Sequence, residues 1–401
     1  MRSRKLILLI LFACGTVLLT GCWNRREMNQ LAINMGLGID KDAKGYRITA
    51  QVVEPREVAS KGGGGGRSPV TVYQSFGKTI YEAIGRVTEE SPRRLYLSHL
   101  RILVLGESLA RDGVAPILDF LSRNHEMRTD FYIVVAKDSK AEEILKVLTA
   151  IEEVPANKLF TSLYESERSW APALTITLDR LINDLVKEGR NPVLTAVKRL
   201  GKKTNTGTQS LGSPDPQARI KISGLAVFKK DKLIGWLDEA ESKGFVYLTD
   251  KVYRTVGPMK CPGGGQLNLE TVRSKTVTKG RVVGGKPEIT VEVHNEGNVG
   301  EVQCGLDLTK PESIDELEQL AGARLKEIVN VTLAAAQKKY KSDIFGFGDR
   351  IRRSDPKGWN AIKKDWEQLF PQMQVQVKTD FQIRRLGTVT NSIFQQLKEK
   401  E

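Results

Sequence analysis

The N-terminus constrains the fold of this chain more than any other segment. Its first basic residues, Arg2, Arg4 and Lys5, precede an apolar run over residues 6–19 that is interrupted only by small residues. A basic start followed by a short apolar segment is the pattern of a secretory signal peptide. The run is shorter than the roughly 20 apolar residues that a helix needs to span a bilayer. We therefore predict that residues 1–21 direct export and are then removed.

The run ends in Leu19-Thr20-Gly21-Cys22, which resembles the bacterial lipobox. Small residues before the cysteine let the extended chain enter a peptidase, and the cysteine thiolate is the nucleophile that takes the lipid. An ordinary secretory peptide that carries Cys22 by coincidence is the alternative. Two acyl chains hold a protein stably at a membrane. The pattern therefore predicts a lipid anchor on Cys22 and a body, residues 22–401, that lies outside the cytoplasm.

Length and charge indicate how many domains residues 22–401 form and which partners they can have. Removal of the signal peptide leaves 380 of the 401 residues, which at about 150 residues per domain suggests two or three domains. The formal net charge of +14 falls to +11 with the loss of Arg2, Arg4 and Lys5. Acidic residues are interleaved with the basic ones, which favours a solvated surface facing anionic lipid. Nucleic acid is not an expected partner outside the membrane.

The cysteines allow one disulfide in the exported body. Of the four cysteines, Cys14 leaves with the signal peptide and Cys22 takes the lipid, so Cys261 and Cys304 remain. Two cysteines do not resemble a zinc site, which needs four ligands at close spacing. An exported protein can form disulfides, but domains of this size do not require them. The residues leave open whether Cys261 and Cys304 pair.

The first domain, residues 22–200, is expected to have helices packed on a sheet. Residues 31–40 and 45–53 read as a hairpin, because apolar and polar residues alternate in the second arm. Ser139-Lys140-Ala141-Glu142 reads as a capping box that opens a helix. Helix and strand patterns alternate between these points. The expected elements are a helix over 80–87, a buried strand over 95–105, a helix over 114–123 and a strand over 131–136.

Two segments of this part are expected to be irregular. The five glycines of residues 62–66 cannot pack side chains and predict a flexible loop. A phosphate cradle is the alternative, but Arg67-Ser68-Pro69 does not supply the lysine and hydroxyl that such a loop needs. Residues 201–217 are rich in Gly, Ser, Thr, Asn, Pro and Lys, and we predict that they form a linker.

The remaining chain predicts two further domains. Residues 218–300 should form a small strand-rich domain, with hairpins over 220–236 and around Gly284-Gly285-Lys286-Pro287. Residues 301–401 should form an α+β domain, because Ser313-Ile314-Asp315-Glu316 reads as a second capping box before a long helix that reaches Tyr340. Helices over 344–353 and 359–370 and a strand over 375–383 should follow. The expected fold class is therefore mixed α+β, in three consecutive domains.

No arrangement of reactive residues predicts catalysis. His99, His125 and His294 lie in separate segments without the spacing of a zinc ligand set, and His125 and Glu126 point in different directions on a helix. Cys261 stands in a loop beside proline and glycines, without the neighbours of a nucleophile. Acidic pairs, such as Glu89-Glu90, fit solvated helix ends better than a glycosidase acting on cell wall. We therefore predict no enzyme, no metal and no cofactor.

Several motifs together resemble one known family. In the first domain they are Cys22-Trp23-Asn24-Arg25-Arg26-Glu27, residues 31–40, and residues 97–104 with Gly106-Glu107. Near the C-terminus they are Asp343-Ile344-Phe345-Gly346-Phe347-Gly348 and residues 359–370. In these motifs the chain is similar to the Ger(x)C family, the C subunits of bacterial spore germinant receptors. The matching segments are mostly apolar, so we expect them to be core.

The resemblance implies a role that the residues alone do not give. It implies a non-catalytic lipoprotein on the outer face of the spore inner membrane, working with membrane A and B subunits to start germination when nutrients appear. A solute-binding lipoprotein that delivers a small ligand to a permease is the alternative, and it predicts two similar α/β lobes around a cleft. A wall-remodelling enzyme is a third, weaker interpretation.

Overall fold

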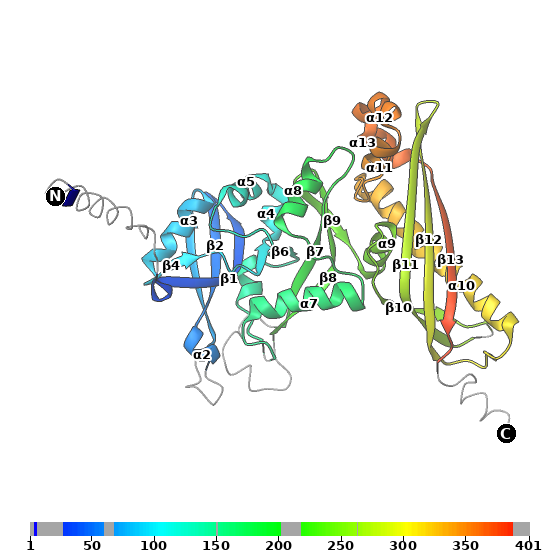
Figure 1. The fold of residues 1–401 in the computed structure, drawn as a ribbon, viewed down its shortest axis with the longest axis horizontal. Coiled ribbons are helices and arrows are strands. Elements are labelled where there is room, and N and C mark those ends of the chain that lie inside the picture. Colours follow the sequence, from blue (N-terminus) through cyan, green and yellow to red (C-terminus); the bar gives the residue numbers. More distant parts are fainter. Residues whose placement is uncertain are drawn as a thin grey trace, which may run out of the picture.

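The computed structural model describes residues 4–5, 27–59, 68–149, 151–201, 218–262 and 264–387. Cys22, the glycine run of residues 62–66 and nearly all of the segment expected as a linker lie outside the described residues. Two β-sheets, each with its own helices, lie side by side along the molecule (Figure 1). We call them, with their helices, the first body and the second body.

The first sheet has a parallel centre and antiparallel flanks. Its strands follow the order β3-β2-β1-β5-β6-β7-β8-β9, and β4 pairs with the start of β1. Strands β1, β5, β6 and β7 are parallel, and the outer strands pair antiparallel. The strands are β1 (Leu31–Asp42), β2 (Gly45–Val53), β3 (Val70–Gly77), β4 (Arg94–Tyr96), β5 (Ile102–Leu105), β6 (Tyr132–Ala136), β7 (Val193–Gly201), β8 (Ala218–Lys229) and β9 (Lys232–Leu237).

Helices cover both faces of this sheet, as a parallel centre requires. Strand β5 shows why, since Leu103 and Leu105 face one helical layer, Ile102 and Val104 face the other, and all four are completely buried. Helices α3, α4, α5 and α8 form one layer, and α6 and α7 form the other. The helices are α2 (Pro55–Ala59), α3 (Ile80–Arg86), α4 (Glu107–Asp112), α5 (Ala115–Arg123), α6 (Ala141–Leu145), α7 (Pro155–Ser169) and α8 (Leu178–Val186).

The second sheet has the order β10-β11-β12-β13 and carries its helices on one face. Strand β12 alternates, with Val291 and Val293 buried beneath the helices and Glu292 and His294 on the outer face. Strand β13 returns parallel to β12 after the helices. The elements are α9 (Glu239–Leu248), β10 (Thr255–Lys260), β11 (Gln266–Val283), β12 (Lys286–Val302), α10 (Pro311–Ala334), a π-helical turn η4 (Ala335–Tyr340), α11 (Phe347–Ser354), α12 (Pro356–Ile362), α13 (Trp366–Leu369) and β13 (Val375–Arg385).

The mixed α+β class, the expected hairpins and the long helix are confirmed. The sheets do not follow the expected domain limits, however. Strand β8 pairs with β7, so the hairpin that was expected to open the middle domain extends the first sheet instead. Strand β12 pairs with β13, so the expected middle and C-terminal segments share the second sheet. The three domain limits themselves stay a prediction.

Three local expectations were wrong. Neither expected capping box forms: Asp40 at the end of β1 accepts the backbone N–H groups of Ala141 and Glu142 at α6, at 2.9 and 3.1 Å. Helix α10 begins at Pro311, two residues before Ser313, and Lys310 makes no side-chain cap. The strand expected over residues 95–105 is divided into β4 and β5 by the turn between them. A contact distant in the chain replaced the first capping box, and an earlier helix start replaced the second.

The two bodies share one apolar core. Buried side chains of the first sheet, such as Leu225 and Leu237, belong to the same cluster as Phe245 of α9 and Val329 of α10. Helix α9 lies between the two sheets (Figure 1). A separate small cluster fills the far end of the second body. Because packed cores deform little, the continuous cluster holds the two bodies in one arrangement.

Candidate functional site

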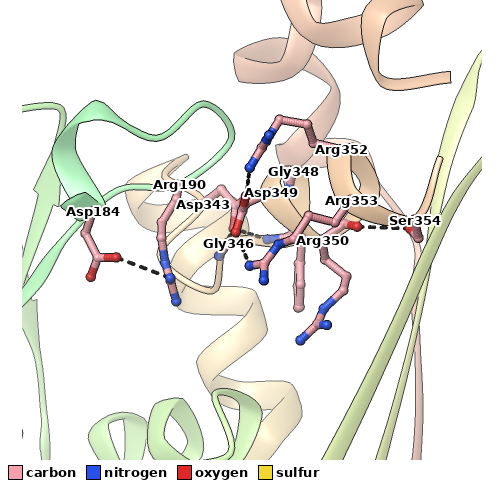
Figure 2. Close-up of polar contacts among 11 residues, drawn as sticks. Asp184, Arg190, Asp343, Gly346, Gly348, Asp349, Arg350, Arg352, Arg353 and Ser354 are labelled. Carbon is pink, nitrogen blue, oxygen red and sulfur yellow. Dashed lines mark hydrogen bonds and ion pairs between the residues drawn. The ribbon is translucent and has the colours of Figure 1, made fainter. Parts of the chain in front are cut away.

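The late motif Asp343–Gly348 lies where the two bodies meet, and we call its surroundings the junction: residues 340–349 together with the turn 188–191. The side chain of Asp343 is buried and accepts the backbone N–H groups of Gly346, Phe347 and Gly348, at 2.9, 3.1 and 2.9 Å (Figure 2). These donors would otherwise be unsatisfied at the start of α11. The carboxylate therefore fixes the entry into that helix.

Burial and hydrogen bonding act on Asp343 in opposite directions. Burial raises the pKa of this carboxyl group to about 6, although the three N–H groups and the charge of Arg190 lower it. A buried carboxylate is unfavourable unless donors surround it. Folding therefore makes the ionisation of Asp343 less favourable than in water, and the three N–H groups offset part of this cost.

Glycines bring the backbones of the two bodies into direct contact. A Cβ atom on Gly348 would lie 2.6 Å from the Cα atom of Gly189, so neither backbone could approach with a side chain present. The N–H of Asp349 donates to the carbonyl of Gly189 at 3.2 Å, and the N–H of Asn191 donates to the carbonyl of Asp343 at 2.7 Å. Gly346 has a φ of 74°, which favours glycine.

The end of the long helix docks on the edge of the first sheet. The hydroxyl of Tyr340 donates to the carbonyl of Trp236 in β9 at 2.5 Å. The hydroxyl of Ser342 donates to the carbonyl of Phe228 in β8 at 2.8 Å. Because β9 is an edge strand, the contact of Tyr340 covers a backbone carbonyl that would otherwise be open to pairing. Tyr340 is the last residue of the π-helical turn η4, and Ser342 follows two residues later.

Charged groups surround this contact. Asp349 is only 1% exposed and pairs with Arg352 at 2.7 Å and with Arg353. Burial acts to raise the pKa of Asp349, but hydrogen bonds from the two arginines bring it below its usual value. From the first body, Arg190 pairs with Asp184 at 3.2 Å (Figure 2). Each of these ion pairs lies within one body, so the contact between the bodies at the centre of the junction is made by backbone groups.

The cysteines expected as site residues have different outcomes. Cys261 and Cys304 form a disulfide that joins the turn after β10 to the segment after β12, across a separation of 43 residues. Cys22, expected to carry the lipid, lies outside the described residues. Within the ranges that the structure does describe, no helix has the length and apolar character to cross a bilayer.

The histidines lie in three different segments of the fold, of which those carrying His99 and His125 meet where the Ser98 hydroxyl donates to the carbonyl of Glu126 at 2.6 Å. His99 packs edge-on against Tyr96, His125 lies in the segment after α5, and His294 pairs with Asp380 on the outer face of the second sheet. Across the described residues, no three His, Cys, Asp or Glu side chains gather in a geometry that could hold a metal ion.

The segments that carry the family resemblance are mostly core, as expected. Residues 31–40 and 97–106 supply buried positions in β1, β5 and the turn before β5. The junction adds a role that sequence reasoning missed, because the late motif is also a contact surface for the turn 188–191. Two lone glycines, Gly189 and Gly348, were the available signal, but nothing in the sequence showed that they face each other.

Family models match both parts of the chain. The model described as spore germination protein N-terminal domain matches residues 24–199. The model described as spore germination B3/GerAC-like, C-terminal, matches residues 223–387. The segment expected as a linker lies between the two matches.

Similar proteins cover nearly the whole chain. Spore germination protein KC of Bacillus subtilis (strain 168) is 32% identical and covers 99% of this chain and 99% of its own length. Spore germination protein GerQC of Bacillus cereus is 23% identical over 94% of this chain and 98% of its own. The crystal structure of the GerBC protein matches with a TM-score of 0.56 and 22% identity, covering 87% of this chain and 96% of that one.

Proposed function

This chain belongs to the GerAC-like family of spore germination proteins, and we propose that it is the C subunit of a spore nutrient germinant receptor. In this role it is a non-catalytic lipoprotein, held by lipid on Cys22 on the outer face of the spore inner membrane. It acts with membrane A and B subunits, and the response to a nutrient depends on the assembled receptor.

The observation that carries the proposal is similarity over both bodies in the order of the chain. A relative named as a spore germination protein covers 99% of this chain at 32% identity. The match therefore extends over both bodies and over the junction that fixes them to each other. A shared function is better supported by such full-length similarity than by a shared fold alone.

The architecture agrees less well with a solute-binding lipoprotein. That class predicts two similar lobes around a cleft, whereas the two bodies here are a nine-stranded sheet with helices on both faces and a four-stranded sheet with helices on one. A shared apolar core also joins them, which does not favour the opening and closing of a cleft.

Deletion of the gene in the spore-forming host tests the proposal. Spores that lack the chain, in a strain without sibling receptors, should fail to respond to the nutrient of this receptor, and a restored copy should recover the response. They should still germinate with a trigger that bypasses nutrient receptors, which controls for spore quality. A normal nutrient response in the deletion strain would refute the proposed role.

A further inference from the structure

The second body contains a cavity that neither the junction nor the proposed function uses. It has a volume of about 280 Å³ and lies between α9, α10, β10 and the inner face of the sheet. Its wall is mostly apolar, with contributions from Met259, Leu269, Leu325, Ile328 and Phe381. Binding sites for small molecules in proteins are commonly apolar hollows of about this size or larger, with a few polar groups.

One residue of β10 opens this space. Thr255, Gly257 and Met259 lie opposite Thr271, Leu269 and Leu267 of β11, so they face the same side of the sheet as these buried residues. A Cβ atom on Gly257 would meet no atom within 4 Å. The row of inward side chains therefore has a gap at Gly257, and a methyl group there would enter the gap without a clash.

The floor of the cavity holds an unsatisfied polar group. Asn295 of β12 is 1% exposed, and neither atom of its carboxamide makes a hydrogen bond of ordinary geometry among the described residues, although the carboxamide lies close enough to the Tyr247 hydroxyl to counter part of the burial-driven rise in the pKa of Tyr247. The nearby hydroxyl of Tyr247 is engaged with the hydroxyl of Thr271 at 3.1 Å. A buried amide without partners is unfavourable, so such groups are rare.

The charges at the rim already have partners. The Nζ atom of Lys243 lies 3.6 Å from a carboxylate oxygen of Glu239. An Nη atom of Arg324 lies 2.6 Å from a carboxylate oxygen of Glu327. The ammonium group of Lys243 also lies 3.6 Å from the centre of the Trp170 ring, which comes from the end of α7 in the first body. The rim therefore offers no free charge to a ligand, and a side chain of the other body stands at its edge.

We propose that this cavity binds a small uncharged molecule with an apolar body and one group that both donates and accepts hydrogen bonds, such as a carboxamide. The apolar wall would take the body of the molecule, and the polar group would pair with the carboxamide of Asn295. A carboxylate would be disfavoured, because the floor groups Asn295, Tyr247 and Thr271 are neutral and a buried charge needs a partner.

The test uses phenylacetamide and phenylacetate, which share an apolar ring and differ in charge. Saturation-transfer NMR on the purified full chain should show binding of phenylacetamide, with a dissociation constant in the millimolar range or below, because so few atoms limit affinity. Phenylacetate should bind at least about tenfold more weakly. Equal binding of the two probes, or no transfer to phenylacetamide, would overturn the proposal.

Three variants locate the binding. Gly257→Phe should abolish transfer to phenylacetamide by filling the gap, and Asn295→Leu should weaken binding about tenfold by removing the polar partner. Val277→Phe adds the same ring on the exposed outer face of β11 and should bind like the parent. Urea unfolding shows that each variant is folded. A folded Gly257→Phe chain that binds like the parent would exclude this cavity as the site.

Discussion

At the scale of single residues, Asp343 shows how burial and local geometry combine in the junction. Its carboxylate satisfies three backbone donors at the start of α11, and it does so in a place where charge is unfavourable. The residue therefore stabilises the turn through hydrogen bonds while its ionisation opposes folding. This conflict gives the protein a pH dependence that can be assigned to one group.

The stability of the protein should fall as the pH rises from about 4 to about 6 because of Asp343. In the unfolded chain an aspartate has a pKa of about 3.9, whereas burial raises the folded value to about 6. The folded state then holds more protons in this window, so the free energy of unfolding decreases with rising pH by up to ~3 kcal/mol. Asp343→Asn cannot ionise and should lack this contribution.

Urea unfolding of the parent and of Asp343→Asn at several pH values measures the effect. Other groups titrate alike in both proteins, so the difference between their free energies of unfolding isolates Asp343. As the pH rises from 4 to 7, the variant should gain stability relative to the parent. A constant difference across this range would show that the pKa of Asp343 is not raised in the folded protein.

Gly348→Ala should weaken the junction. Its methyl group would lie 2.6 Å from the Cα atom of Gly189 and 2.8 Å from the ring of Trp359, so the two bodies would have to separate slightly. Overpacking of this kind costs about 1–3 kcal/mol. Gly305→Ala is the matched control, because a Cβ atom there meets no neighbour within 4 Å. Equal urea midpoints for the two variants would contradict the close contact.

At the scale of elements, the sequence predicts strands and helices better than their partners. The hairpins of β1 with β2 and of β11 with β12 follow from alternation and turn residues, which are local. The cap of α6 cannot be predicted from local sequence, because its acceptor, Asp40, is 101 residues away from Ala141. A Ser and a Glu at capping-box spacing were present, but the tertiary contact determined the helix start.

The disulfide of Cys261 with Cys304 should stabilise the far end of the second body. It closes a loop of 43 residues, and constraining the unfolded chain to this extent is worth about 3–4 kcal/mol. Addition of a reductant should therefore lower the urea midpoint of the parent. The double variant Cys261→Ser with Cys304→Ser should have the lower urea midpoint without reductant, and adding reductant should not change it. A parent protein that is insensitive to full reduction would contradict this role.

At the scale of the whole molecule, the fold class and the family could be predicted, but the division into sheets could not. The change in pattern near residue 218 suggested a new domain, yet β8 and β9 complete the first sheet. Alternation shows that a strand has two unlike faces, but it does not say which sheet the strand joins. The junction likewise depends on Gly189 meeting Gly348, a contact between distant segments.

The central claim is that this protein is a subunit of a germinant receptor and that lipid on Cys22 holds it at the membrane. The chain with Cys22→Ala should be exported behind an ordinary secretory signal peptide, so that an uncut apolar run does not hold it at the membrane. Asn29→Ala, which leaves the lipobox intact, is the control. Both proteins are expressed in spores that lack the parent.

The decisive measurement combines nutrient-triggered germination of these spores with blots of their membrane and soluble fractions. We predict that the Cys22→Ala protein moves to the soluble fraction and that the nutrient response is lost, while the control keeps both properties. A Cys22→Ala protein that stays in the membrane fraction and supports a normal response would show that contacts with partners, and not lipid, hold the protein in place.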